Sequence, residues 1–160
     1  MKLDEALLQR LADWRPDGRQ SVTAADEAAG WSVTVTADRC DEIGCRVWEA
    51  AVRRTAAAPE AGPQALRAWA DRIAGRITGL LEPLHLVEVD AARNEALLRS
   101  VEPTRRGDDA FYSELLLRGT RAAELRRYRA ARPDARREQV AFALTHEALA
   151  KVVGDLTAEA

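Results

Sequence analysis

Hydrophobic residues change their spacing along this chain, from a helical period to an alternating one and back. Leu3, Leu7 and Leu11 lie four residues apart, which is typical of one face of an amphipathic helix and predicts a helix over residues 3–14. From Trp31 the run WSVTVTA alternates apolar with hydroxyl side chains, which predicts a half-buried strand over residues 31–37. The chain is therefore expected to combine helices with strands.

The same two periods place the remaining elements. Leu66, Trp69 and Ile73 recur at helical spacing after Pro63, a residue suited to the first turn of a helix. Short turns separate the later strands, as in an antiparallel meander. We predict a helix at residues 63–81, strands at 45–55, 84–90, 95–101, 110–118, 121–131 and 137–144, and a closing helix at 146–157.

These elements predict one α+β domain over residues 1–160, with about five to seven antiparallel strands and three amphipathic helices packed on them. A chain of 160 residues most naturally forms one domain. Residues 23–30 would suit a short capped helix. The β-branched alternation that follows them speaks against a recognition helix, and so against a helix-turn-helix.

Charge and hydropathy narrow the setting in which the protein works. The net charge is −2, so no overall field attracts nucleic acid or a membrane. No apolar run approaches the roughly 18–20 residues of a membrane span. The first residues, MKLDE, lack the basic and apolar regions of a secretory signal. We expect a cytoplasmic protein.

Residues that could carry catalysis or bind a metal are few. The sequence contains no phosphate-binding loop, dinucleotide fingerprint, zinc-protease motif or nucleophile elbow. We expect His85 in a strand, as a core or edge residue, and His146 exposed at the start of the last helix. Two thiols alone cannot complete a zinc site. Cys40 and Cys45 could form a disulfide across a hairpin, but we expect free thiols in a reducing compartment. The prediction is no catalytic residue, cofactor or metal.

Charged residues of both signs occur in successive predicted strands. Because side chains alternate along a strand, several of them can share one face of the sheet. There they would form a ladder of ion pairs, or a polar face that a partner covers. The residues concerned are Glu88, Arg99, Glu114, Arg118, Glu124 and Arg126.

Arginine is concentrated in residues 118–137. Eight arginines there face only Glu124 and Asp134, which gives the segment a net charge of +6 in a chain whose total is −2. Such asymmetry can mark an anion-binding surface or one for an acidic partner. The alternative is pairing with carboxylates inside the fold or across a dimer. The candidate surface is Arg118, Arg121, Arg126, Arg127, Tyr128, Arg129, Arg132, Arg136 and Arg137.

These features favour a non-catalytic protein-interaction module of an adaptor or chaperone type, with a protein partner or a second copy of the chain. The helix–sheet–helix layout is similar to that of small secretion-chaperone-like and immunity-like domains, a likeness of layout alone. One alternative is a small anionic ligand, or a substrate, held by arginines such as Arg99 or Arg126. Another is nucleic acid bound through residues 118–137. That alternative is weaker because Tyr128 is the segment's one aromatic residue.

Overall fold

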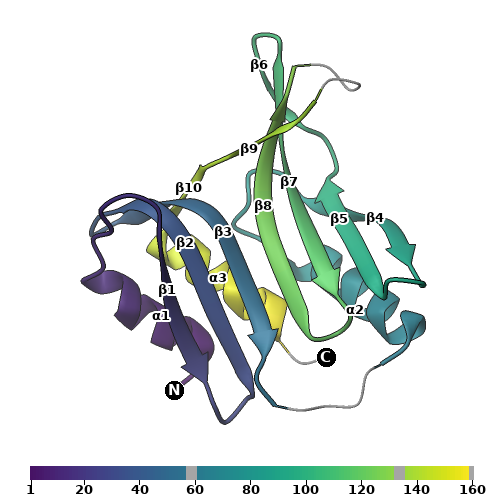
Figure 1. Cartoon of the computed structure of the whole chain (residues 1–160), viewed down its shortest axis with the longest axis horizontal. Helices are drawn as coiled ribbons and strands as arrows, with labels where there is room; N and C mark the ends of the chain where they lie inside the picture. The colour runs from purple at the N-terminus through teal and green to yellow at the C-terminus, as the bar shows by residue number, and fades with distance from the viewer. Residues whose placement is uncertain (57–60, 132–135, 159–160) are drawn as a thin grey trace.

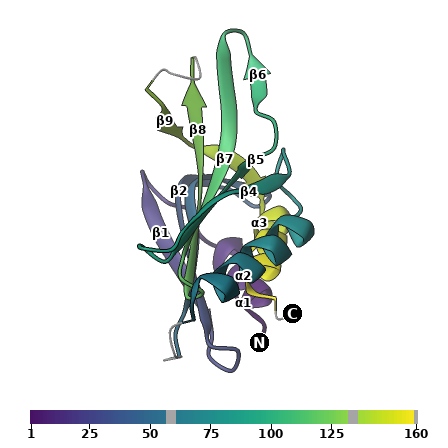
Figure 2. The same cartoon turned by 90° about the vertical axis from the view of Figure 1, so that its right-hand side faces the viewer.

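The computed structural model of the protein describes residues 1–56, 61–131 and 136–158. In these described ranges ten strands form one antiparallel sheet, and three helices lie on the same side of it (Figures 1 and 2). The expected α+β class is confirmed. The elements in chain order are α1 (Leu3–Ala12), β1 (Gln20–Asp26), β2 (Trp31–Cys40), β3 (Gly44–Arg54), α2 (Pro63–Arg76), β4 (Leu84–Asp90), β5 (Glu95–Ser100), β6 (Thr104–Arg106), β7 (Asp109–Arg118), β8 (Ala122–Ala130), β9 (Glu138–Val140), β10 (Phe142–Thr145) and α3 (His146–Thr157).

The sheet is assembled from two runs of neighbouring strands. Its order is β1-β2-β3-β8-β7-β5-β4, so β3 and β8 join an N-terminal run to a C-terminal one. Beyond that shared stretch, β10 pairs with β3 and β9 pairs with β8, while β6 extends the hairpin of β7. The last part of the chain therefore crosses the junction between the two runs.

The helices form where the sequence supplies apolar stripes and suitable ends. Leu3, Leu7 and Leu11 of α1 are all buried. Pro63 opens α2, and the hydroxyl of Thr145 accepts a hydrogen bond of 3.0 Å from the Ala148 N–H at the start of α3. Helix α1 packs on β1 and β2, α3 on β3 and β10, and α2 on β4 and β5.

One hydrophobic core lies between the sheet and the helices. Strands β5, β7 and β8 contribute Leu98, Leu115 and Leu125, which are fully buried. In the same core, Trp31 of β2 and Trp69 of α2 stack with ring centroids 6.1 Å apart. The core is therefore continuous from the N-terminal to the C-terminal run of strands.

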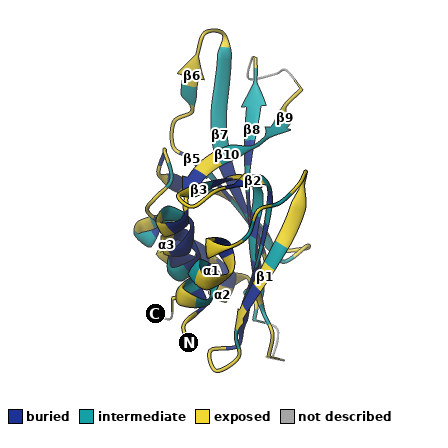
Figure 3. Ribbon diagram, turned by 90° about the vertical axis from the view of Figure 1, so that its left-hand side faces the viewer, coloured by how far each residue is buried: buried dark blue, intermediate teal, exposed yellow. Residues whose placement is uncertain are grey.

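The sheet has more strands than the predicted five to seven. Strand β1 was not predicted, because only Ala24 of its residues is buried and the others lie at an exposed edge of the sheet (Figure 3). The expected strand at 137–144 is two short strands, β9 and β10, which pair with different neighbours. Strand β6 has only three residues, too few for a period to show in the sequence.

The second helix is shorter than the predicted span of residues 63–81. Helix α2 ends at Arg76, and Ile77 already has an extended backbone. Gly79 has a φ of +92°, and a Cβ there would lie 3.4 Å from the Ala148 carbonyl oxygen of α3. Ile77 is buried and Leu80 packs against the core from this loop, so their helical spacing does not come from a helix.

None of the helices in the described residues has the length and apolar character needed to cross a bilayer.

Candidate functional site

The face of the sheet opposite the helices carries a two-dimensional array of charged and aromatic side chains, called here the open face. The register places Arg99, Glu114 and Arg126 side by side on β5, β7 and β8, and Leu97, Leu116 and Glu124 beside them. The three helices of the described residues all pack on the opposite face of the sheet (Figure 2). Arg137, just before β9, reaches over the open face and bonds Glu114. The open face comprises Glu49, Glu95, Leu97, Arg99, Tyr112, Glu114, Leu116, Arg118, Glu124, Arg126, Tyr128 and Arg137.

Every carboxylate on the open face is bonded to arginine. Glu114 accepts hydrogen bonds from Arg99 Nε, at 2.8 Å, and from Arg137 Nη1, at 2.6 Å. Arg118 bonds Glu124 through Nε and Nη2. The bond to Glu124 raises the pKa of Arg118 above its ordinary value, so this guanidinium stays charged.

Two further pairs extend this network across the sheet. Arg126 reaches Glu49 on β3, with both Nε and Nη2 2.7 Å from the same oxygen. Arg118 also bonds Glu95 on β5 at 3.0 Å. The pairs therefore cross β3, β8, β7 and β5, and most of the ladder expected from the sequence is present. Glu88 of β4 has no part in these pairs.

The two signs of charge lie at different depths. The side chains of Arg99, Arg118 and Arg126 are 40%, 48% and 38% exposed, whereas Glu114 and Glu124 beneath them are 6% and 14% exposed. Solvent therefore meets a layer of guanidinium groups held in place by carboxylates below. An arginine held in this way loses less side-chain freedom when a partner binds it.

Two tyrosines stand within this charged layer. Tyr112 and Tyr128 pair directly across β7 and β8, with ring centroids 5.9 Å apart. The Arg137 guanidinium lies 3.9 Å from the Tyr128 ring centroid, and that of Arg99 lies 5.6 Å from the Tyr112 centroid. A shallow depression of about 380 Å³ runs past Leu97, Leu116 and Tyr128 on the same face.

The structure disperses the predicted arginine surface. Arg118, Arg126, Tyr128 and Arg137 lie on the open face. Arg127 points to the helix side and is buried. Arg129 bonds Glu138 of β9 at 2.7 Å, Arg121 lies in the turn between β7 and β8, and Arg136 is exposed. Arg132 lies outside the described residues. The role of the predicted arginine surface in binding a partner stays a prediction. The open face combines part of that surface with Arg99 and Glu114, which were not among its predicted residues.

Arg127 forms a buried ion pair with Glu82, each 6% exposed. Its two terminal nitrogens bond the two carboxylate oxygens of Glu82 at 2.8 and 2.9 Å. Ser100 and Thr104 donate to the same carboxylate at 2.7 and 2.6 Å, and Arg127 also bonds Ser113. This network ties the loop after α2 to β5, β6, β7 and β8.

We predict that this network makes the protein less stable in acid. Burial alone would raise the pKa of Glu82, but hydrogen bonds from Arg127, Thr104 and Ser100 outweigh it and leave the pKa below 4.5, the ordinary value. The stabilisation is therefore complete above the unfolded-state pKa and is lost as the pH falls through the folded-state one. Urea unfolding measures the free energy of unfolding of wild type and of Glu82→Gln. The advantage of wild type should be smaller at pH 3 than at pH 7. An equal difference at both pH values would contradict this assignment.

A cleft of about 580 Å³ opens beside this ion pair, on the helix side of the sheet. Its lining is mostly apolar and includes Leu80, Phe111 and Phe142, with Arg127 and Arg106 as its charged members. Arg106 lies over the Phe111 ring, 5.8 Å from the centroid. The cleft thus contains an arginine that is already neutralised by Glu82 and one that lies at the surface.

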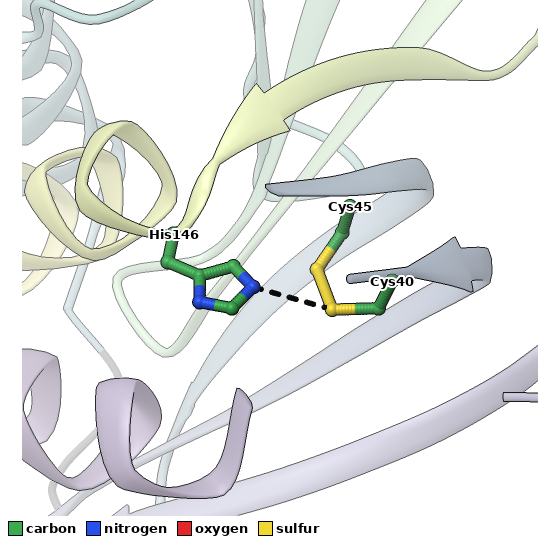
Figure 4. A group of neighbouring side chains, drawn as sticks. All are labelled: Cys40, Cys45 and His146. Atoms are coloured by element: carbon green, nitrogen blue, oxygen red, sulfur yellow. Dashed lines mark hydrogen bonds between the residues drawn. A yellow bond between two sulfur atoms is a disulfide. The ribbon is translucent and has the colours of Figure 1, made fainter. Parts of the chain in front are cut away.

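A cluster of two cysteines and a histidine lies at the start of β3. Cys40 and Cys45 face each other across the β2–β3 hairpin and form a disulfide. The expectation of free thiols is therefore corrected, because the hairpin brings the two residues opposite each other. The expectation that His146 is exposed is also wrong. It is only 9% exposed, and its Nε2 lies 3.4 Å from Cys40 Sγ (Figure 4).

The sequence could not reveal this cluster, because 106 residues separate Cys40 from His146. Pairing of β10 with β3 carries the start of α3 to the hairpin turn. The other histidine, His85, is exposed on the edge strand β4, as an edge residue.

Comparison of the chain with protein-family models, curated proteins and solved structures gives no match.

Proposed function

We propose that the protein is a non-catalytic interaction module that binds an acidic protein surface through its open face. The observation that carries the proposal is the layering of charge there. Exposed guanidinium groups stand above carboxylates that hold them in fixed positions. Acidic side chains of a partner would meet oriented donors, and arginine binds carboxylates with two parallel hydrogen bonds.

The other residues of the open face also suit a protein partner. Tyrosine and arginine are enriched at the centres of protein interfaces and in their binding hot spots. Leu97 and Leu116 are partly exposed in the shallow depression, beside Tyr128. Apolar contact surrounded by oriented charges is the composition expected of a specific docking surface.

A second copy of the chain fits this face less well. In a symmetric dimer the same patch of each chain meets, so two surfaces with the same outer layer of arginines would face each other. The carboxylates that could neutralise them are already bonded within their own chain. The outer layer of arginines on this face therefore favours an acidic partner over a second copy.

Nucleic acid is also less well supported as the partner. Single strands are held by stacking bases on free aromatic rings. Tyr112 and Tyr128 stack on each other, and Arg137 lies over Tyr128. Their ring faces are therefore engaged by protein groups.

A small anionic ligand remains the alternative, and the cleft beside Glu82 is where it would bind. Arg127 lines that cleft, but both of its terminal nitrogens are bonded to Glu82. An anion would have to compete with a buried carboxylate at the same donors. On the open face the guanidinium groups of Arg99, Arg118 and Arg126 are also bonded to glutamates, but these side chains are 38–48% exposed, so an anion reaches them without entering the core. The open face is therefore the better supported site.

The proposal can be tested with labelled polyglutamate as an acidic protein probe. We expect wild type to bind it, and Arg118→Gln/Arg126→Gln to bind about tenfold more weakly, because two exposed charge pairs worth up to about 1 kcal/mol each are lost. The control Arg67→Gln/Arg72→Gln removes equal charge from exposed positions of α2 and should bind like wild type. Fluorescence anisotropy measures all three. Equal loss in both variants, or tighter binding of single-stranded DNA of matched charge, would contradict the proposal.

A further inference from the structure

The Cys40, Cys45 and His146 cluster has the composition and spacing of a metal site. The two sulfurs and a ring nitrogen of His146 all lie within 4.8 Å of one another. Tetrahedral zinc, with Zn–S of about 2.3 Å and Zn–N of about 2.0 Å, places a sulfur and a nitrogen ligand about 3.5 Å apart. The separation between Cys40 Sγ and His146 Nε2 is 3.4 Å. Figure 4 shows the imidazole pointing at the sulfur pair.

We propose that, once its disulfide is reduced, the protein binds one zinc ion through Cys40, Cys45 and His146. The site is independent of the proposed interaction through the open face. Zinc and the disulfide exclude each other, because a sulfur bonded to sulfur is not a thiolate ligand. The same three residues therefore have a disulfide state and a zinc state.

Conversion of the disulfide state to the zinc state requires an external reductant, such as a dithiol. A dithiol transfers two electrons and two protons to the disulfide, which gives two thiols while the dithiol itself becomes a disulfide. Zinc then displaces one proton from each thiol as the two thiolates bind it. His146 binds as the neutral imidazole, through Nε2.

The backbone around the cluster is held in place by contacts that do not depend on the disulfide. The carboxylate of Asp41 accepts hydrogen bonds from the Ile43 and Gly44 N–H groups, at 2.8 and 2.9 Å, and so fixes the hairpin turn. The Ile43 carbonyl oxygen accepts a 2.8 Å bond from the His146 N–H. These bonds connect the turn directly to the start of α3.

Close packing adds to these hydrogen bonds. A Cβ on Gly44 would lie 2.8 Å from the Leu144 carbonyl oxygen, so a side chain at this position would force the hairpin away from β10. After reduction, zinc binding requires only that the two sulfurs separate to about 3.8 Å, the spacing of two thiolates on tetrahedral zinc.

Three protein ligands leave one coordination position for water. Zinc sites of this kind, with two cysteines and one histidine, differ from closed structural sites, which use four protein ligands. The cysteines and His146 are each less than 10% exposed, so a water in this position would have little contact with bulk solvent. This composition favours zinc over hard cations, which prefer oxygen ligands.

The test uses cobalt in place of zinc, because cobalt bound to thiolates gives an intense charge-transfer absorption. We expect the phosphine-reduced protein to bind one Co²⁺ with this band, and added Zn²⁺ to displace it. The oxidised protein should give no band. These comparisons use the wild-type chain, so a folding defect cannot account for the result. A reduced protein without a thiolate band would overturn the proposal.

Variants identify the ligands. Cys45→Ser and His146→Gln should each weaken Co²⁺ binding more than the roughly 10–100-fold that is typical of losing an outer-shell partner. His85→Gln, which removes the exposed histidine on β4, is the matched control and should bind like reduced wild type. Circular dichroism checks that each variant is folded. A folded His146→Gln that binds Co²⁺ as tightly as wild type would also overturn the proposal.

Discussion

Replacing Arg127 by methionine should lower the free energy of unfolding by about 3–5 kcal/mol, the range found when one partner of a buried ion pair is removed. Glu82 would keep its hydrogen bonds from Ser100 and Thr104 but would lose both bonds to the guanidinium. A buried carboxylate without its counter-charge is the main cost. Urea unfolding at pH 7 measures it.

The preceding residue, Arg126, offers a matched control. Arg126 also pairs with a glutamate, but its side chain is 38% exposed and lies on the open face. Arg126→Met should therefore change stability by no more than about 1 kcal/mol. The double variant Glu82→Leu/Arg127→Met should be more stable than Arg127→Met alone, because no unpaired charge is left buried. Equal losses for Arg126→Met and Arg127→Met would contradict the burial assigned to Arg127.

Replacing Trp31 by alanine should cost about 3–5 kcal/mol, as expected for truncation of a large buried aromatic side chain. Trp31 is 2% exposed, stacks on Trp69 of α2, and lies beneath the Arg54 guanidinium, 4.4 Å from it. Because the core is continuous, the variant should still unfold in one transition at a lower urea concentration.

Trp48 provides the comparison for that prediction. It is half-buried, with its indole N–H bonded to Asp38 at 2.9 Å and Arg19 stacked on its ring. Trp48→Ala should cost less than Trp31→Ala. Two separate unfolding transitions in Trp31→Ala, detected by circular dichroism, would mean that the two strand runs do not share one core.

Sequence periodicity predicted the parts of the fold that bury regular apolar stripes. The helix predicted at residues 146–157 coincides with α3, and its apolar residues Leu149, Val152, Val153 and Leu156 form a buried stripe. The hairpins of β4–β5 and β7–β8 followed from alternation and turns. Strand β1 gave no such signal, since it is the last strand of the sheet among the described residues and only Ala24 of its residues is buried.

The candidate sites depended on contacts that sequence distance hides. The alternation of side chains predicts that Arg99, Glu114 and Arg126 share one face. It does not predict how deeply each side chain is buried. The burial of Arg127 follows the same alternation, since its neighbour Leu125 also points to the helices. Its pairing with Glu82, 45 residues away, needed the loop after α2 to be placed. The cluster around His146 likewise required the pairing of β10 with β3.

The most direct measurement of the proposed function is a titration of the ¹⁵N-labelled protein with polyglutamate, followed by amide chemical shifts in two-dimensional NMR. We predict that the shifts concentrate on β5, β7 and β8, at and around Arg99, Arg118 and Arg126, and that α1, α2 and α3 are little affected. Shifts centred on the helices or on the cleft beside Glu82, or no shifts at all, would contradict an interaction surface on the open face.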